Sequence, residues 1–273
     1  MRTAAAVLLI LALAAPASAA ETDLNLNGAF VQGGLVQGRA EPRSAVTLDG
    51  VAVPVTPEGD FIIGFGRGAK GTATLTVTPP GEKAKSRTLK IAKRDFKVQR
   101  IDGLPKRKVE PQQQDLTRIR GEQAMINAVR QLKTLTRGFA DGFQWPVTGR
   151  ISGVYGSQRI LNGQPRSPHY GVDIAAPEGT AIEAMAAGRV ALVHQDMFFT
   201  GKTVMIDHGL GLSSIYIHMS KIAVKEGDPV TRGQKIGEVG MTGRATGPHL
   251  HWGVAWQKTQ LDPALLVGEM PKK

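Results

Sequence analysis

The sequence His169-Tyr170-Gly171-Val172-Asp173 separates a histidine from an aspartate by four positions, with a glycine and a β-branched residue between them. Such residues favour a β-strand over a helix. Because side chains on a strand alternate between its two faces, an even spacing places both polar groups on one face. The segment therefore predicts a strand that presents an imidazole and a carboxylate side by side.

A second pair, His249 and His251, is separated by one residue, so these imidazoles are also expected on one face of a strand. All six histidines of the chain lie between His169 and His251. We therefore expect the two strands to meet and to supply three metal ligands and one neighbouring base. The spacing leaves open which of His249 and His251 is a ligand.

Cysteine is absent from the whole sequence, which excludes structural disulfides and thiolate metal sites. Any metal ion must therefore be held by histidine and carboxylate. Zinc accepts neutral imidazole and carboxylate in a tetrahedral arrangement, and catalytic zinc sites keep one position open for water. The histidine pattern thus predicts a site for one zinc ion.

Three stretches around these residues resemble, in order, the signature of the lysostaphin/LytM-type zinc metallopeptidases, which cleave bacterial peptidoglycan. They are Arg166-Ser167-Pro168-His169-Tyr170-Gly171-Val172-Asp173-Ile174-Ala175-Ala176-Pro177, Tyr216-Ile217-His218-Met219 and Thr246-Gly247-Pro248-His249-Leu250-His251-Trp252. The similarity extends over about 143–267. No position of the three motifs is substituted.

The resemblance implies a role for each of five residues. His169, Asp173 and His251 would be the ligands of one zinc ion, and His218 and His249 would be the catalytic histidines beside it. It also implies a zinc metalloendopeptidase that hydrolyses peptide cross-links of peptidoglycan during cell-wall remodelling. A D-alanyl–diaminopimelate bond fits a Gram-negative envelope best. The assignment of base and acid to the two catalytic histidines stays open.

Two other functions compete with hydrolysis. Some members of the resembled family are catalytically silent wall-binding proteins that activate a peptidoglycan amidase, but such proteins usually lack the ligands that this chain retains. The motifs Gly-Asp-x-Val and Gly-Gln-x-Ile-Gly also resemble domains that carry biotin or lipoate. Those carriers need an exposed lysine, usually beside methionine, and no Met-Lys-Met occurs in this sequence.

The rest of the chain predicts a mainly β protein. Apolar residues make up 41% and charged residues 21%, which fits neither a disordered nor a polytopic membrane protein. Residues 21–95 contain short β-prone runs, and Asp49-Gly50 between two of them predicts a hairpin turn. We expect a small antiparallel β-sandwich here, with an immunoglobulin-like topology as the candidate.

A basic linker and a helix are predicted over 96–142. Apolar residues recur every three or four positions from Gln112 to about Arg137, which indicates a helix that packs on one of its neighbours. Beyond it, 143–267 is predicted to be an all-β metallopeptidase domain of barrel-sandwich type. Residues 268–273 are a tail.

The first twenty residues have the pattern of a secretory signal peptide. Arg2 precedes an apolar run from Ala4 to Ala15, and small residues of the A-x-A type follow. The run is too short to cross a bilayer as a helix. We therefore expect removal of 1–20, a location in the periplasm or cell envelope, and no stable membrane insertion after cleavage.

Positive charge is concentrated in one segment. The chain has a formal net charge of +11, and residues 82–108 contain eleven basic against three acidic side chains. An anionic envelope surface is one candidate partner, and a solvated strand edge with its linker is the simpler interpretation. Export and the presence of only one aromatic residue, Phe96, argue against nucleic acid.

Several residues outside the five predicted site positions also have polar side chains. Arg159 and Asn162 precede His169 and are candidates for holding a peptide backbone or carboxylate. Tyr216 is expected on the strand face of His218, as a substrate contact or a packed residue at the rim. His194 and His208 match no catalytic position and are predicted to be structural. The segment 240–247 is predicted to be a turn near the metal.

Overall fold

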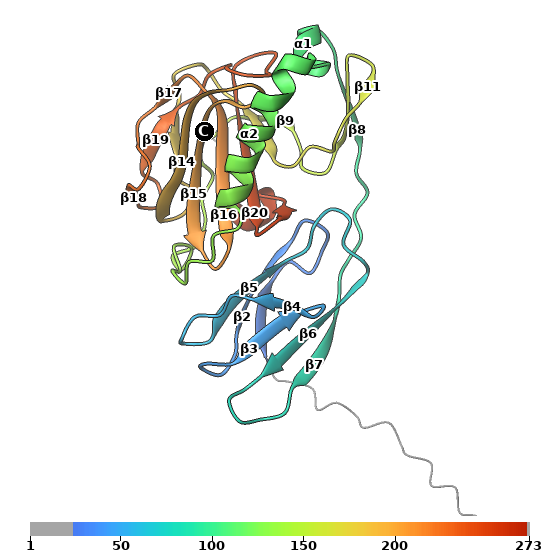
Figure 1. Cartoon of the computed structure of the whole chain (residues 1–273), viewed down its shortest axis with the longest axis vertical. Helices are drawn as coiled ribbons and strands as arrows, with labels where there is room; N and C mark the ends of the chain where they lie inside the picture. The colour runs from blue at the N-terminus through green and yellow to red at the C-terminus, as the bar shows by residue number, and fades with distance from the viewer. Residues whose placement is uncertain (1–23, 272–273) are drawn as a thin grey trace, which may run out of the picture.

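The structure is a computed structural model that describes residues 24–271 (Figure 1). The strands of the N-terminal part, drawn in blue, lie below a larger set of strands that runs from green to red. The mainly β fold class is confirmed. The predicted signal peptide, 1–20, lies outside the described residues. Within 24–271, no helix combines the length and the apolar character needed to cross a membrane.

The N-terminal part contains two antiparallel sheets, ordered β1-β2-β5 and β4-β3-β6-β7. Their bounds are β1 (Asn25–Gly28), β2 (Leu35–Arg39), β3 (Ala45–Leu48), β4 (Val51–Val53), β5 (Asp60–Gly64), β6 (Thr72–Thr78) and β7 (Lys85–Lys90). A constant-type immunoglobulin sandwich also has seven strands, but its fourth strand belongs to the first sheet, whereas β4 pairs here with β3. Asp49 and Gly50, both with positive φ, form the predicted turn of that hairpin.

The C-terminal part is built on one eight-stranded sheet. Its order is β18-β14-β15-β16-β20-β12-β9, and β21 also pairs with β20. The bounds are β9 (Arg150–Gly153), β12 (Val172–Ala175), β14 (Gly188–Met197), β15 (Gly201–Gly209), β16 (Leu212–Met219), β18 (Pro229–Val230), β20 (His249–Trp256) and β21 (Thr259–Leu261). Every residue of β16 is buried, as expected for a central strand covered on both faces.

Two smaller sheets and two short helices also belong to this part. The sheet β13-β19-β17 contributes Ile182 and Ile236 to the same buried core as Tyr216 and Trp252 of the large sheet. The remaining elements are α1 (Lys106–Val109), β10 (Gln158–Leu161), β11 (Gln164–Pro165), β13 (Ala181–Glu183), β17 (Lys221–Ile222), β19 (Lys235–Glu238) and α3 (Ala264–Val267).

The basic segment 82–108 is divided between the two parts of the molecule. Strand β7 lies at the edge of its sheet, where charged side chains hinder pairing with other chains. Further along, β8 (Val98–Ile101) runs parallel to β10 and forms a three-stranded sheet with β10 and β11. The segment expected as a linker therefore contributes a strand to the C-terminal part.

Helix α2 (Gln113–Val129) packs across the large sheet, as the green helix in Figure 1 shows. Its buried Ile126 and Val129 contact Met205 and other apolar residues of β14, β15 and β16, so the expected packing on a neighbour is confirmed. The expected end at Arg137 is wrong. The helix ends at Val129, and the backbone after it forms a hydrogen bond with the β15–β16 turn. In this bond Leu210 N donates to Thr134 O at 2.6 Å.

Candidate metal centre

Strands β12 and β20 bring Asp173 and His251 together. The two residues are direct partners in this antiparallel pair, so their side chains leave the same face of the sheet. His251 Nδ1 lies 2.7 Å from Asp173 Oδ1. The alternation predicted for these strands therefore holds for Asp173, His249 and His251.

His169 joins this pair from a loop and not from a strand. The prediction of one strand from His169 to Asp173 is wrong, because β12 begins only at Val172. Two backbone hydrogen bonds hold the loop: Gly156 N donates to His169 O at 2.7 Å, and His169 N donates to Ser157 O at 2.8 Å. These two bonds take the place of the hydrogen bonds between paired strands, and they orient the imidazole towards Asp173.

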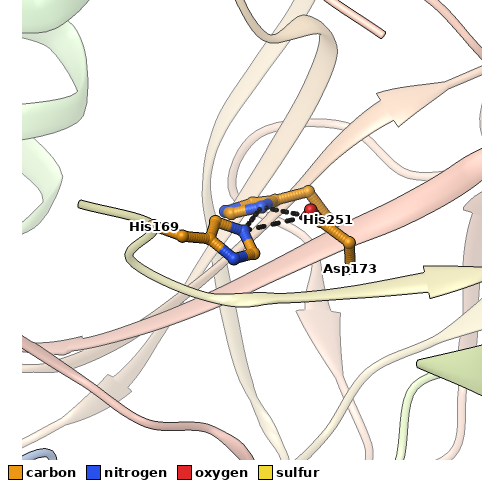
Figure 2. Close-up of side chains that lie close together, drawn as sticks. All are labelled: His169, Asp173 and His251. Atoms are coloured by element: carbon orange, nitrogen blue, oxygen red, sulfur yellow. Dashed lines mark hydrogen bonds and ion pairs between the residues drawn. The ribbon is translucent and has the colours of Figure 1, made fainter. Parts of the chain in front are cut away.

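The three side chains converge on one point (Figure 2). His169 Nε2 lies 3.0 Å from Asp173 Oδ1 and 2.9 Å from His251 Nδ1. The possible ligand atoms of His169, Asp173 and His251 all lie within 4.8 Å of one another. Within 24–271, these three residues form a group that could hold a metal ion. All three side chains are largely buried, so water competes little for these atoms.

Hydrogen bonding prepares His169 to be a ligand. Its Nδ1 lies 3.0 Å from the backbone carbonyl oxygen of Val154, which can only accept, so Nδ1 carries the proton. The lone pair of Nε2 then faces Asp173 and His251. A backbone carbonyl in this position is one of the usual partners of a metal-binding histidine. Two imidazoles and one carboxylate form a donor set that fits zinc.

His218 and His249 lie beside this group. Their ring centres are 4.8 Å apart, and the His218 and His251 rings are separated by 6.3 Å. His218 Nδ1 donates to Thr242 O and His249 Nδ1 donates to Gly247 O, both at 2.8 Å. Since each Nδ1 holds a proton, each Nε2 is available as a proton acceptor. The loop 240–247 therefore orients both histidines, in the place predicted for it.

A local irregularity of β16 brings His218 to this face. The φ of His218 is 66°, a value that non-glycine residues rarely adopt, and the β15–β16 register shifts between Lys202 and Val204. Tyr216, two residues earlier, is fully buried in the core and accepts a hydrogen bond from Met185 N. The expectation that Tyr216 shares a face with His218 is wrong, and Tyr216 is a core residue.

Burial keeps the imidazoles of His218 and His251 neutral. It lowers the pKa of His251 to about 4 and that of His218 well below the usual value, because an imidazolium loses its hydration there. Burial alone would raise the pKa of Asp173, but hydrogen bonds to His169 and His251 outweigh it and hold that pKa well below its usual range. Neutral imidazole and ionised carboxylate are the forms that bind metal.

Arg159 has a role that its sequence position did not reveal. Its Nη2 lies 2.5 Å from Asp173 Oδ2, the carboxylate oxygen that faces away from the two histidines. Asn162 does not face the site, because its amide bonds the backbone N and O of Leu104. Position 159 is fourteen residues from Asp173, and no local pattern links the two. Only the tertiary structure brings them together.

Two glycines allow the ligands to pack closely. A Cβ atom on Gly171 would lie 2.7 Å from His251 Nε2, and a Cβ atom on Gly153 would lie 2.4 Å from Asp173 Oδ2. Real Cβ atoms do not approach other atoms so closely, because packed interiors tolerate little overlap. The glycine in the first motif thus makes room for a ligand from the third motif.

The remaining histidines occupy structural positions, in agreement with the sequence interpretation. His194 Nδ1 accepts a hydrogen bond from Asp196 N within strand β14. His208 is fully buried, with Nδ1 2.7 Å from Ala187 O and Nε2 2.8 Å from Ser214 Oγ. Neither belongs to the group at the metal centre.

Comparison with known proteins places this arrangement in context. Residues 167–263, which include all five predicted site residues, match peptidase family M23. The peptidoglycan DD-endopeptidase ShyB of Vibrio cholerae is 35% identical over 130 residues, which cover 48% of this chain and 27% of ShyB. The peptidoglycan DD-endopeptidase ShyA of the same species is 42% identical over 112 residues, covering 40% of this chain and 26% of ShyA. The chain thus spans about a quarter of the length of these curated relatives.

A solved structure matches over more of the chain. It is the crystal structure of a peptidase M23 protein from Pseudomonas aeruginosa, which is 33% identical in sequence. The match covers 87% of this chain and 95% of that protein, with a TM-score of 0.68. The likeness therefore includes the N-terminal strands as well as the part that contains the histidines.

Proposed function

We propose that this chain, which belongs to peptidase family M23, is a zinc-dependent endopeptidase that hydrolyses peptide cross-links of bacterial peptidoglycan. One observation carries the proposal: His169, Asp173 and His251 direct three ligand atoms at one point, with His218 and His249 beside them. The names of ShyA and ShyB support peptidoglycan as the substrate.

In this proposal His169, Asp173 and His251 hold one zinc ion. When bound, zinc acts as a Lewis acid towards the scissile carbonyl and lowers the pKa of a water molecule towards ~7. The protein supplies the orientation of its ligands through Val154 O on His169 and through Arg159 on Asp173.

The proton transfers are assigned to His218 and His249. Each presents an unprotonated Nε2, since its Nδ1 donates to a backbone carbonyl of the loop 240–247. One of them accepts a proton from the attacking water, and the pair then donates to the leaving amine and stabilises the developing negative charge. The low pKa of His218 keeps its imidazole in the accepting form at neutral pH.

The proposed bond is a D-alanyl–diaminopimelate cross-link, in the periplasm or cell envelope. The DD-endopeptidase relatives support this bond type. The rival function, a silent activator of an amidase, has no support at the site, because every ligand and both catalytic histidines are retained. The basic segment 82–108 as a contact with an anionic envelope surface stays a separate prediction.

Digestion of purified sacculi tests the proposal. We expect the zinc-loaded protein, with no added partner, to release muropeptides whose cross-links are cut, as identified by mass spectrometry. Asp173→Ala should lose both zinc and activity, whereas His218→Ala should retain zinc and lose turnover. His194→Ala, a histidine outside the site, is the matched control and should behave as the wild type. Full hydrolysis by a zinc-free Asp173→Ala protein would refute the proposal.

A further inference from the structure

Three arginines converge beside the metal centre. Arg159 lies on β10, Arg166 follows β11, and Arg244 lies in the loop 240–247. All three line a cavity of about 570 Å³ that is also lined by His169 and His251. Arg159 and Arg244 also line a second cavity, with His218 and His249. The two arginines therefore lie where both cavities meet the site.

Most of this positive charge has no anionic partner among the described residues. Arg166 donates only to carbonyl oxygens, those of Pro165 at 3.1 Å and Val109 at 3.0 Å. The side chain of Arg244 makes one hydrogen bond, to Lys108 O at 3.3 Å, and its guanidinium lies 4.5 Å from the centre of the Phe199 ring. Neither arginine forms an ion pair within 24–271. A guanidinium has five N–H donors, so most donors of Arg244 are unused.

The partly buried position of these guanidinium groups raises the free-energy cost of their unpaired positive charge. Burial, together with repulsion from Arg159 and Arg166, lowers the pKa of Arg244 to about 10. Arg159 pairs with Asp173 through Nη2, but its Nε is buried without a hydrogen-bond partner. A buried polar donor without a partner costs free energy, and a buried cation without an anion costs more. The cavity is therefore electrostatically complementary to an anion.

We propose that Arg166 and Arg244, with the unpaired Nε of Arg159, form a subsite for a free carboxylate of the peptide substrate, next to the bond that is cut. This inference rests on the proposed function and adds a determinant of specificity to it. Guanidinium groups match carboxylates in geometry and can bind them through two parallel hydrogen bonds. The lone acidic side chain lining the larger cavity, Glu110, pairs with none of the three arginines in the described chain.

The chemistry of the proposed cross-link provides such a group. In a D-alanyl–diaminopimelate bond, the carbon that bears the scissile nitrogen also bears a free carboxylate. The group would therefore be delivered within a few bonds of the reacting carbonyl, in the same cavity as the metal ligands. A substrate in which this carboxylate is converted into a carboxamide has almost the same size but lacks the charge. The subsite should distinguish these two substrates.

Matched cross-linked muropeptide dimers, with a carboxylate or a carboxamide at that carbon, test the inference. We expect the zinc-loaded wild type to favour the free carboxylate by about 10–100-fold in kcat/KM, the usual value of a hydrogen bond between charged groups. Arg166→Gln and Arg244→Gln should each reduce this preference severalfold while zinc content is unchanged. Arg189→Gln, which also loses a hydrogen bond to a carbonyl but lies on β14 outside these cavities, should keep the preference.

The outcomes separate this inference from the proposed function. Equal cleavage of the two dimers by the wild type would overturn the carboxylate subsite and leave the endopeptidase proposal intact. Cleavage of neither dimer would overturn both. If Arg244→Gln does not fold, Arg244→Lys retains the charge and should keep part of the preference. An unchanged preference in both Arg166→Gln and Arg244→Lys would assign the discrimination to other residues and would also contradict the inference.

Discussion

Asp173 contacts both a histidine of the candidate metal centre and an arginine: its Oδ1 lies 2.7 Å from His251 Nδ1, and its Oδ2 lies 2.5 Å from Arg159 Nη2. The arginine thus holds the carboxylate plane by one oxygen while the other faces the histidines. Such outer contacts orient metal ligands and are important for affinity.

Replacement of Arg159 should therefore weaken metal binding. We expect Arg159→Gln to lower zinc affinity by about 10–100-fold, as is typical when an outer partner of a ligand is removed. Competition with a chromogenic chelator would measure this change. Arg244→Gln should leave the affinity unchanged, because Arg244 bonds no ligand in the described structure. Equal affinities for Arg159→Gln and the wild type would show that Asp173 is held without the arginine.

A single added carbon at Gly171 should disturb His251. The Cβ of Gly171→Ala would lie 2.7 Å from the His251 ring and 2.5 Å from Trp252 O, so the ring or the strand must shift. We expect loss of zinc affinity and of sacculus hydrolysis. Gly121→Ala is the matched control, since no atom beyond the adjoining residues and backbone of α2 lies within 4 Å of an added Cβ at that position. Gly121→Ala should raise stability by up to about 1 kcal/mol, measured by urea denaturation.

The buried His208 should make the protein less stable in mild acid. Burial lowers its pKa to about 4, against about 6.5 in the unfolded chain. As the pH falls below about 6.5, the unfolded state binds a proton that the folded state does not, so stability decreases until about pH 4. The total effect of this group is about 3 kcal/mol.

Urea denaturation between pH 7.5 and pH 5 checks this prediction. Other buried histidines contribute in the same direction, so the comparison must be made with His208→Asn, which removes only the one titrating group. The variant should be less stable at pH 7.5 but should lose less stability on acidification. Parallel pH curves for the two proteins would contradict the assignment.

Removal of the metal should lower thermal stability reversibly. A ligand that binds only the folded state stabilises it by about 4 kcal/mol when its concentration is about a thousandfold above its Kd. We therefore expect chelation to lower the Tm by several degrees and added zinc to restore it. In Asp173→Ala neither treatment should shift the Tm. A shift of the same size in that variant would place the stabilising ion elsewhere.

Some features could be predicted from short stretches of sequence because their causes are local. Asp49 and Gly50 tolerate positive φ, so the hairpin between β3 and β4 followed from two residues. The even spacing of His249 and His251 predicted a common face because strand alternation extends over neighbouring residues only. Resemblance to a known family then indicated which of these residues would bind zinc and which, together with His218, would be catalytic.

Other features depended on contacts between distant segments. His169 is oriented by backbone hydrogen bonds to the loop at Ser157, and no pattern within its own motif predicts them. The helix ends at Val129, before its apolar periodicity does, because the following residues bond to the turn at Leu210. His218 departs from regular alternation since its strand is distorted against β15.

The sequence by itself therefore determined the β class and predicted which side chains form the candidate site, because residue type and short spacing are properties of the chain alone. The tertiary structure decided how those side chains meet. It placed Arg159 on the far oxygen of Asp173, and it brought Arg166 and Arg244 from separate loops to one cavity. Such long-range pairing is a result of packing and strand register, which no local stretch of residues encodes.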